Sequence, residues 1–449
     1  MTETSARRLA LAFLIALGVY TLACIYSPIS WSPDSSKVAF LNMAPVPGEE
    51  PEGEKWLWEV WVADIATEKC TKLYEGKAGL TAPVWSPDGK RLAFCETPEK
   101  PEQPVVLILL EPGGESRKHP LPGTELPGEK GRDEEPAFCQ LAATWRPDGN
   151  AVCVALPTRS KEEDKVLALV VDTTSGKIIW QKANTLNYPS WSPDGKWIAG
   201  YGESAFVLVS TADWSVKELW KPKEGGEGAG GKGVYMPQPP AWSPDSTKLC
   251  VTNSNGAEGH DTGVWVVDVA SGEAKLLTGN DDAGSACWSP DGKQIACSLI
   301  LAGEKADNVE LMSILTIDLA TGERELLVVG RPNQPLNLTT AWSPDGKWIA
   351  YRSTTEGGKS AEQSESVVRL VSRDGKQHKV LYVSDQQMLT IATSLTEQAK
   401  EAENNADLRK LLKGDAEQIL KDIPKRFPDA KLTEKLRELE KALKDLDPR

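Results

Sequence analysis

A four-residue motif, Trp-Ser-Pro-Asp, recurs along most of the chain and restricts its possible folds more than any other feature. It occurs seven times, with arginine in place of serine in the third copy. The motif tryptophans are Trp31, Trp85, Trp145, Trp191, Trp242, Trp288 and Trp342. Successive copies lie 46 to 60 residues apart, the length of one supersecondary unit that needs neighbours to bury a core. Such units fold as propellers or solenoids.

Each copy of the motif predicts a tight turn between two antiparallel strands. Proline fixes φ at the first central position, aspartate follows it, and the next position requires a left-handed conformation. Glycine or serine occupies that position in every copy. A short apolar run of strand type comes directly after the turn, as in residues 91–94 and 348–351. The motif therefore marks the turn between the first two strands of each unit.

A second turn is marked by an aspartate that precedes a glycine by four residues. The clearest examples are Asp172 with Gly176, Asp268 with Gly272, and Asp318 with Gly322. The aspartate can cap backbone amides of the turn while glycine adopts the left-handed conformation. With a further strand after this turn, each unit supplies four antiparallel strands, the content of one propeller blade. The sequence thus predicts an all-β fold, a seven-bladed β-propeller of four-stranded antiparallel blades.

The run Trp-Ser-Pro-Asp-Gly-Lys-x-Ile-Ala, followed by a strand ending in aspartate and then a glycine turn, resembles the TolB-type, WD-repeat-like propeller repeat. The resemblance covers residues 27–384. TolB itself, as the family is known, has six blades behind a separate amino-terminal domain. This chain has seven units, and only six residues separate Cys24 from Trp31. The resemblance therefore implies the fold and not the Tol role.

The first 26 residues have the pattern of an export signal or a membrane anchor. Two arginines precede an apolar run at residues 9–23, and Cys24 ends that run. The sequence Leu-Ala-Cys at this point resembles a bacterial lipobox, although Thr21 stands where that pattern has leucine. Lipid attachment at Cys24, an uncleaved anchor and an ordinary cleaved signal are the three export interpretations. The remaining alternative is a strand at residues 19–25.

The formal net charge of −14 argues against nucleic acid and against an anionic membrane surface as partners. The last 54 residues hold 13 acidic and 13 basic side chains, so the propeller region carries the whole excess of negative charge. We therefore expect a protein partner with a neutral or basic contact surface.

Two of the eight cysteines occur at a repeated position. Cys153 and Cys250 lie eight residues after a motif tryptophan, where the other five units have alanine. Cysteine there replaces a small buried residue, which predicts packed free thiols. The sequence assigns no disulfide to the other cysteines, and no Cys-x-x-Cys spacing indicates zinc.

Few residues point to a binding or catalytic site. A motif tryptophan at one blade position is most simply an apolar residue packed between blades. Trp56 and Trp58 alternate beside an expected loop, so we consider them, with His260, as candidate ligand-binding residues. The three histidines lie in different units, and a Gly-x-Ser-x-Gly nucleophile motif is absent from the sequence. We assign no catalytic residue, metal or cofactor.

Loop lengths separate the two faces of the predicted propeller. The turns between strands one and two, and between three and four, share one face and are short. The other loops and the connections between blades share the opposite face, which we call the long-loop face. Its insertions are residues 42–55, 122–138, 221–238, 252–263, 301–310 and 353–366. Binding residues commonly lie on such loops.

A change of composition predicts a helical tail. Residues 385–394 are expected to add a closing strand, and helical spacing begins near residue 396. Gly414 fits a helix end, and Asp415 with Gln418 fits a capping box for the next helix. The last helix has one apolar stripe: Leu432, Leu436, Leu439, Leu443 and Leu446. This stripe predicts docking, and we favour a local helical hairpin from Asp415 onward over the propeller rim or a partner's helix. Residues 416–431 resemble the end of a tetratricopeptide unit.

The expected organisation is a signal or anchor at 1–26, a propeller at 27–394 and a helical tail at 395–449. We interpret the chain as a non-enzymatic scaffold, exported to the cell envelope and tethered there, at the periplasmic or the outer surface. It would bind a protein or another ligand through its long-loop face. The alternative is an enzyme, a hydrolase or lyase, with a site built from scattered polar residues at the central channel.

Lipid attachment is the first testable prediction. If Cys24 is the acylated first residue of the mature protein, mass spectrometry of the membrane-extracted chain will find a lipid-modified peptide beginning at Cys24. A Cys24→Ala variant should lose the modification and move to the soluble envelope fraction. An intact peptide containing Met1 would contradict acylation and support the uncleaved anchor.

Overall fold

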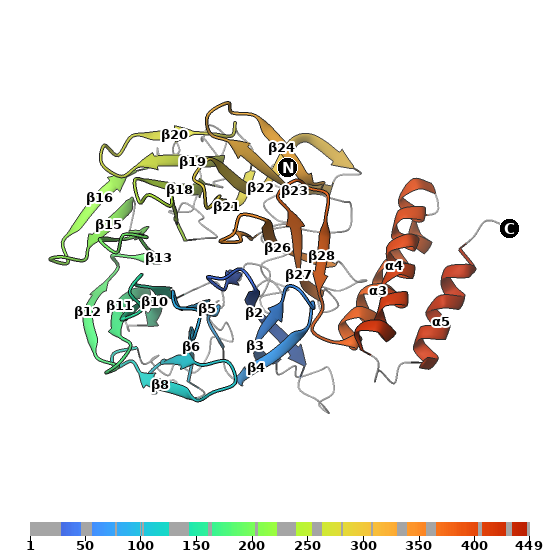
Figure 1. Cartoon of the computed structure of the whole chain (residues 1–449), viewed down its shortest axis with the longest axis horizontal. Helices are drawn as coiled ribbons and strands as arrows, with labels where there is room; N and C mark the ends of the chain where they lie inside the picture. The colour runs from blue at the N-terminus through green and yellow to red at the C-terminus, as the bar shows by residue number, and fades with distance from the viewer. Residues whose placement is uncertain are drawn as a thin grey trace.

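Seven four-stranded antiparallel sheets form a ring (Figure 1). The computed structural model describes residues 28–45, 56–76, 79–98, 100, 103–124, 143–159, 164–202, 205–221, 239–253, 263–279, 282–306, 309–329, 339–355, 365–402, 406–427 and 433–446. Each sheet consists of four strands that are consecutive in the sequence. The expected seven-bladed propeller is confirmed, and the sheets are called blades 1 to 7 in chain order.

The strands of each blade run outward from the centre of the ring in sequence order (Figure 1). The innermost strands end at the motif tryptophans: β1 (Ser30–Trp31), β5 (Val84–Trp85), β9 (Thr144–Trp145), β13 (Asn187–Trp191), β17 (Ala241–Trp242), β21 (Asp282–Trp288) and β25 (Thr340–Trp342). The second strands are β2 (Lys37–Pro45), β6 (Leu92–Glu96), β10 (Ala151–Arg159), β14 (Trp197–Tyr201), β18 (Lys248–Asn253), β22 (Gln294–Ala306) and β26 (Trp348–Thr355).

The third strands are β3 (Trp56–Asp64), β7 (Val106–Leu110), β11 (Asp164–Asp172), β15 (Phe206–Ser210), β19 (Gly263–Asp268), β23 (Val309–Asp318) and β27 (Glu365–Ser372). The outermost strands are β4 (Cys70–Gly76), β8 (Ser116–Pro120), β12 (Ile178–Ala183), β16 (Val216–Trp220), β20 (Ala274–Leu276), β24 (Arg324–Val328) and β28 (His378–Leu381). Within the insertion at residues 301–310, expected as a loop, the described residues 301–306 and 309–310 instead extend β22 and β23. The two strands continue to pair up to Ala306 and Val309, so the insertion is largely a longer hairpin.

One hydrophobic cluster fills each interface between neighbouring blades, and each cluster contains one motif tryptophan. These seven side chains are only 6 to 8% exposed. The expected packing of the motif tryptophans between blades is therefore confirmed. Cys153 and Cys250 are buried and carry free thiols, as their repeated position predicts.

Most motif tryptophans also donate a hydrogen bond to the preceding blade. The acceptor is the backbone oxygen of the residue just before that blade's own motif tryptophan. The bonds run from Nε1 of Trp31 to Ala341 (2.9 Å), Trp145 to Val84 (3.0 Å), Trp242 to Ser190 (2.9 Å) and Trp288 to Ala241 (3.0 Å). The motif tryptophans thus supply both the packing between blades and, in these four cases, a hydrogen bond between their innermost strands.

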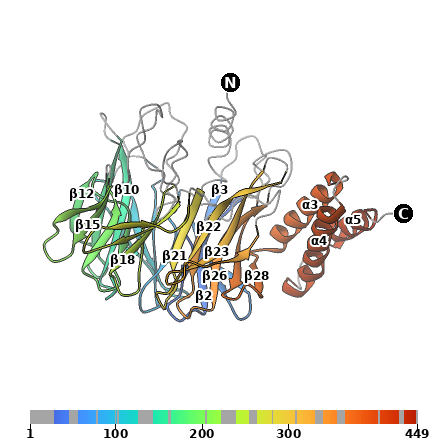
Figure 2. The ribbon, with the colours of Figure 1, turned by 90° about the horizontal axis from the view of Figure 1, so that it is seen from above.

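Three helices follow the last blade and lie beside the ring (Figure 2). They are α3 (Asp385–Glu401), α4 (Ala406–Arg426) and α5 (Thr433–Lys444). The expected closing strand at residues 385–394 is wrong, because Ser384 caps a helix there by accepting a hydrogen bond from the Gln387 amide. None of the described helices is long and apolar enough to cross a membrane.

Gly414 does not end a helix, and Asp415 with Gln418 does not cap a new one, contrary to expectation, because all three lie inside α4. Gly414 faces open space, while its neighbours Leu412 and Ala416 are buried. Their burial in the cluster shared with α3 outweighs the roughly 1 kcal/mol helix penalty of glycine. Tertiary packing has overridden local propensity.

The apolar stripe of the last helix is docked, as predicted. Leu443 and Leu446 are buried in one cluster with α3 and α4, and Leu436 and Leu439 pack against it. Leu432 lies outside the described residues. The cluster also includes Val367 of β27 and Tyr382, which directly follows β28. The helices therefore pack on one another and on the propeller rim.

Inter-blade packing generates the second prediction. Trp191 is 6% exposed and lies in the cluster between blades 3 and 4. Trp191→Ala should lower the free energy of unfolding by about 3–5 kcal/mol, because it leaves a cavity where a large aromatic ring was buried. Urea unfolding followed by circular dichroism measures the change. The control is Ile179→Ala, since Ile179 is 46% exposed; an equal effect of both would contradict the assigned role.

Candidate functional site

Of the residues that the sequence singled out for binding, two lie outside the described residues: Cys24 and His260. Trp56 begins β3, and its side chain is outside the described part. Trp58 is 7% exposed and packs in the cluster between blades 1 and 2, so its ring is buried in the propeller. Trp58 is thus the one of these side chains that the structure describes, and the binding role of all of them stays a prediction.

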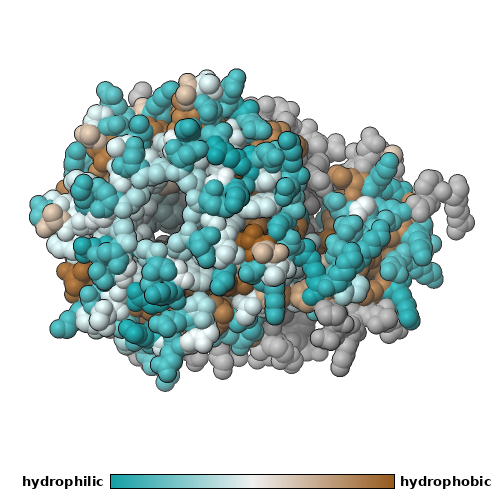
Figure 3. All heavy atoms as spheres, viewed as in Figure 1, coloured by the Kyte–Doolittle hydropathy of each residue, from teal (hydrophilic) through white to brown (hydrophobic). Residues whose placement is uncertain are grey.

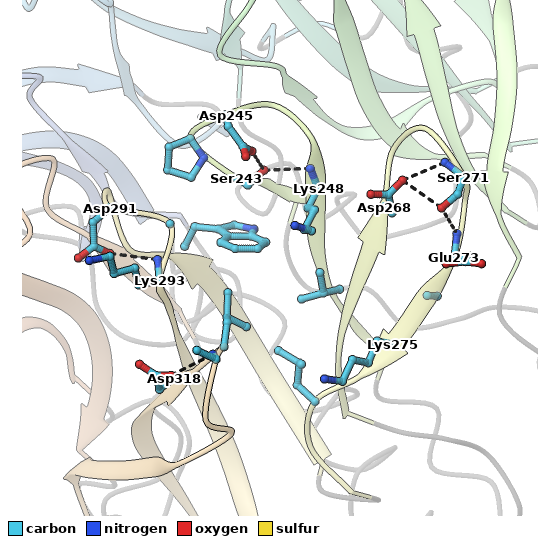
Figure 4. Close-up of a pocket in the computed structure, with 18 residues that line it drawn as sticks. Ser243, Asp245, Lys248, Asp268, Ser271, Glu273, Lys275, Asp291, Lys293 and Asp318 are labelled. Carbon is cyan, nitrogen blue, oxygen red and sulfur yellow. Dashed lines mark hydrogen bonds between the residues drawn. The ribbon is translucent and has the colours of Figure 1, made fainter.

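A groove of about 1120 Å³ lies between blades 5 and 6 (Figure 4). Its walls come from the first and second turns of both blades, at residues 243–248, 268–273, 288–293 and 318–320, and from β20 with Leu277. These are the short turns, so the groove opens on the face opposite the long-loop face. Figure 3 shows the ring hollowed at its centre as well.

Apolar side chains form part of the groove lining. Trp288 is nearly buried, and Val266, Leu277 and Leu319 are half-buried. The Trp288 ring is held in place because its Nε1 donates to Ala241 of blade 5 at 3.0 Å. Accessible aliphatic groups beside this buried ring suit an apolar side chain of a ligand.

Four aspartates of the lining shape the turns around it. Asp245 accepts a hydrogen bond from the Ser243 hydroxyl at 2.6 Å, and Ser243 accepts one from the Lys248 amide at 2.9 Å. The same Ser-x-Asp network forms at Asp291. In the second turns, Asp268 and Asp318 each accept from two backbone amides and a hydroxyl. The sequence pattern predicted these turns, and each carboxylate has a structural task.

These hydrogen bonds favour the charged carboxylates. The Ser243 hydroxyl, followed by the Thr247 amide and hydroxyl, lowers the pKa of Asp245 to about 2. The Ser271 amide and hydroxyl lower the pKa of Asp268, and the Thr321 amide lowers that of Asp318. The Ser289 hydroxyl lowers the pKa of Asp291, with a further contribution from Arg373. All four aspartates are therefore ionised at neutral pH.

Charge in the groove is mixed, with acidic groups in excess. Glu273 joins the four aspartates, and the lining contains three lysines, Lys248, Lys275 and Lys293, so acids exceed bases by two. The lysines and Glu273 are exposed. Nowhere in the described part of the chain do three His, Cys, Asp or Glu side chains gather as they would around a metal ion. The arrangement suits recognition of a neutral or basic segment that carries an apolar side chain.

Sequence reasoning did not find this groove. Each lining turn is an ordinary copy of the repeat, and the hollow arises from how two blades are placed side by side. The one local signal is the length of β20, which has three residues and is the shortest outer strand described.

The ring of four-stranded blades, the Ser-x-Asp turns and the inter-blade tryptophans define the class: this chain is a seven-bladed β-propeller. A search against family models found no match. Two curated relatives match part of the chain.

The first relative is the uncharacterized protein Atu1656 of Agrobacterium fabrum, 24% identical over 188 residues, which are 42% of this chain and 57% of the relative. The second is the uncharacterized peptidase YuxL of Bacillus subtilis, 25% identical over 232 residues, which are 51% of this chain and 30% of the relative. The matches thus span little more than half of one relative and less than a third of the other.

Solved structures share the propeller at low sequence identity. An oligogalacturonate lyase in complex with manganese has a TM-score of 0.52 at 15% identity, over 77% of this chain and 88% of that one. The propeller domain of the trilobed protease from Pyrococcus furiosus, described as an open velcro topology, has a TM-score of 0.51 at 12% identity, over 79% and 97%. TolB from Acinetobacter baumannii has a TM-score of 0.41 at 16% identity, over 76% and 79%. At these identities the likeness concerns the fold alone.

The lowered aspartate pKa values give the third prediction. Asp245 has a folded pKa of about 2 against about 3.9 in the unfolded chain. A depressed pKa contributes stability above the unfolded value, and that contribution is lost as pH falls from about 4 toward 2. The melting temperature of Asp245→Asn should therefore lie below that of the wild type at pH 6, and the difference should shrink at pH 2.5. A difference that is constant over this range would contradict the assignment.

Proposed function

We propose that this chain is a non-enzymatic, envelope-tethered propeller that binds a segment of a partner protein in the groove between blades 5 and 6. The observation that carries the proposal is the groove itself. Its fixed Trp288 ring and half-buried aliphatic groups lie next to exposed charges of both signs. Interfaces commonly combine a central apolar contact with a polar rim in this way.

The charges favour one kind of segment. Acidic groups exceed lysines in the lining, and the propeller region carries the whole excess negative charge of the chain. A segment with an apolar residue flanked by neutral or basic residues would meet complementary charge on approach. The net charge also disfavours nucleic acid as a partner.

Export and tethering rest on the sequence of residues 1–26, with lipid at Cys24 or an uncleaved anchor holding the propeller at the membrane surface. The long-loop face, with Trp56, Trp58 and His260, is kept as a second surface for the same partner or for another ligand.

An enzymatic role at the central channel is the alternative. It is favoured by the partial match to the peptidase YuxL and by the shared fold with the oligogalacturonate lyase. Hydrolysis of peptide and oligosaccharide libraries by the purified chain would support this alternative.

Charge reversal at the groove rim is the fourth prediction. Glu273→Lys should weaken recovery of a neutral or basic partner about two- to fivefold, and Lys275→Glu should maintain or increase it, because one rim charge contributes up to about 1 kcal/mol. Quantitative mass spectrometry after cross-linking and isolation from envelope extract measures the recovery.

The matched controls are Glu218→Lys and Lys182→Glu, exposed charges on the outer strands β16 and β12. Salt should reduce the difference between the two groove variants, because exposed charges are screened. If the controls change recovery as much as the groove variants, or if neither groove variant changes it, the groove is not the binding site.

A further inference from the structure

The propeller ring has one interface that differs from the others in its chain connectivity. Blade 1 contains β1 to β4 and blade 7 contains β25 to β28, so the two ends of the described chain share no sheet. A propeller in which one blade combines strands from both ends is closed by backbone hydrogen bonds. Here the interface between blades 7 and 1, which we call the seam, is held by side-chain contacts.

Near the centre of the ring, the seam is held in the manner of other interfaces. Trp31 Nε1 donates to Ala341 at 2.9 Å, and the Asp345 amide donates to the Ser35 hydroxyl at 2.9 Å. A buried arginine on β26, Arg352, donates from Nη2 to the Leu41 backbone oxygen at 2.6 Å. These bonds secure the inner and middle part of the seam.

The outer part of the seam is held by Lys379 of β28. Its Nζ donates to the Ile65 backbone oxygen of blade 1 at 2.7 Å and lies 3.6 Å from a carboxylate oxygen of Glu68. Both side chains are largely shielded, with 22 and 25% exposed, so solvent screens this pair less than a surface pair. The last strand of blade 7 thus contacts the second turn of blade 1.

The C-terminal helices add a further contact across the seam. Arg426, in the last turn of α4, donates from Nη1 to the Val380 backbone oxygen of blade 7 at 3.0 Å. Its Nη2 lies 2.5 Å from Glu68 of blade 1. Its guanidinium also lies 5.4 Å from the ring centroid of Tyr382. One side chain from the helices therefore touches both blades.

The helices are packed firmly against blade 7. Their shared cluster includes Val367 and Tyr382, with Val380 packed against it, so apolar burial fixes them on the side of blade 7. Among the contacts described, the helices reach blade 1 only through the guanidinium group of Arg426. The apolar contacts anchor the helices, and the ion pair crosses the seam.

The backbone conformation at Glu68 supports a role for its side chain in the seam contacts, besides forming the turn. Its φ is +57°, a left-handed conformation that is unfavourable for a side chain with a Cβ. Five other blades have glycine with positive φ in the second turn: Gly113, Gly176, Gly272, Gly322 and Gly375. Blade 1 retains glutamate at this strained position, and its carboxylate is the group that both Lys379 and Arg426 contact.

We propose that the C-terminal helices act as an intramolecular clasp that holds blades 1 and 7 together, with Arg426 of α4 and Glu68 of blade 1 as the contact that closes it. In this interpretation the docked helices have a target in the chain itself, the one interface whose two blades are not consecutive in the sequence. The alternative is that the helices only cover an apolar patch on blade 7 and leave the seam unaffected.

A native cysteine reports on the seam. Cys70, at the start of β4, is half-buried and packs against the cluster formed by blades 7 and 1. Burial raises the pKa of its thiol to about 12, with Arg426 opposing and Glu68 adding to the rise, so the thiol reacts slowly with alkylating reagents while the seam is closed. Cys153, fully buried between blades 3 and 4, reports on unfolding elsewhere in the ring.

The fifth prediction concerns alkylation of the full-length native protein, followed at each cysteine by peptide mass spectrometry. Arg426→Ala and Glu68→Gly should each raise the labelling rate of Cys70 by about three- to tenfold, the range expected for a shielded ion pair with additional hydrogen bonds. Glu68→Gly should fold normally, because glycine suits the left-handed turn. The double variant should label no more than about twofold faster than the faster single variant, because both remove one contact.

The matched control is Arg373→Ala, which removes an arginine bonded to Asp291 at 3.2 Å across the interface between blades 6 and 7. It should leave Cys70 labelling unchanged. Unchanged or slower Cys70 labelling in Arg426→Ala would overturn the proposal even if Glu68→Gly labels faster, because Arg426 lowers and Glu68 raises the pKa of the thiol directly. So would an equal rise at Cys153, because the variants would then unfold the ring as a whole.

Discussion

The fold depends on the packing of one tryptophan between each pair of blades. The second and third strands are apolar at consecutive positions, as in β7, where four of five residues are buried. A sheet with two apolar faces is stable only when both faces are covered. The neighbouring blade covers each face, and the motif tryptophan fills the inner part of the interface. No blade is therefore expected to be stable alone, and loss of one interface should weaken the whole ring.

Much of this architecture could be predicted because it repeats. Seven copies of the motif gave the blade count, the turns and the strand order, and the repeated position of Cys153 and Cys250 gave their burial. Predictions that relied on a single local signal were less successful. Residues 385–394 resembled a strand and Gly414 resembled a helix end, but burial of the helical residues around them decided both outcomes. The insertion at residues 301–310 was placed in a loop because its continued strand pairing has no clear sequence signal.

The groove could not be predicted in the same way. Asp245, Asp268, Asp291 and Asp318 were recognisable as turn residues, and Trp288 as a packing residue, but nothing in the sequence indicates that two blades leave a space between these turns. Departures from the repeat were more informative than the repeat itself. Glu68 and Trp214 both adopt positive φ where other blades have glycine. Glu68 makes ion pairs, and Trp214 stacks on Trp180 of the preceding blade at 5.5 Å.

The construction of every blade from one continuous stretch of chain also affects how the molecule can fold. Pairing within a blade joins residues close in sequence, and the interfaces from blade 1 to blade 7 can form in chain order. The bond between Trp31 and Ala341 joins residues 310 positions apart and cannot form before the last blade exists. Loop closure over such a distance is entropically unfavourable, and long-range contacts form slowly. A growing chain would thus be an open arc with two uncovered apolar faces, and its exposure to aggregation would end only when the arc closes.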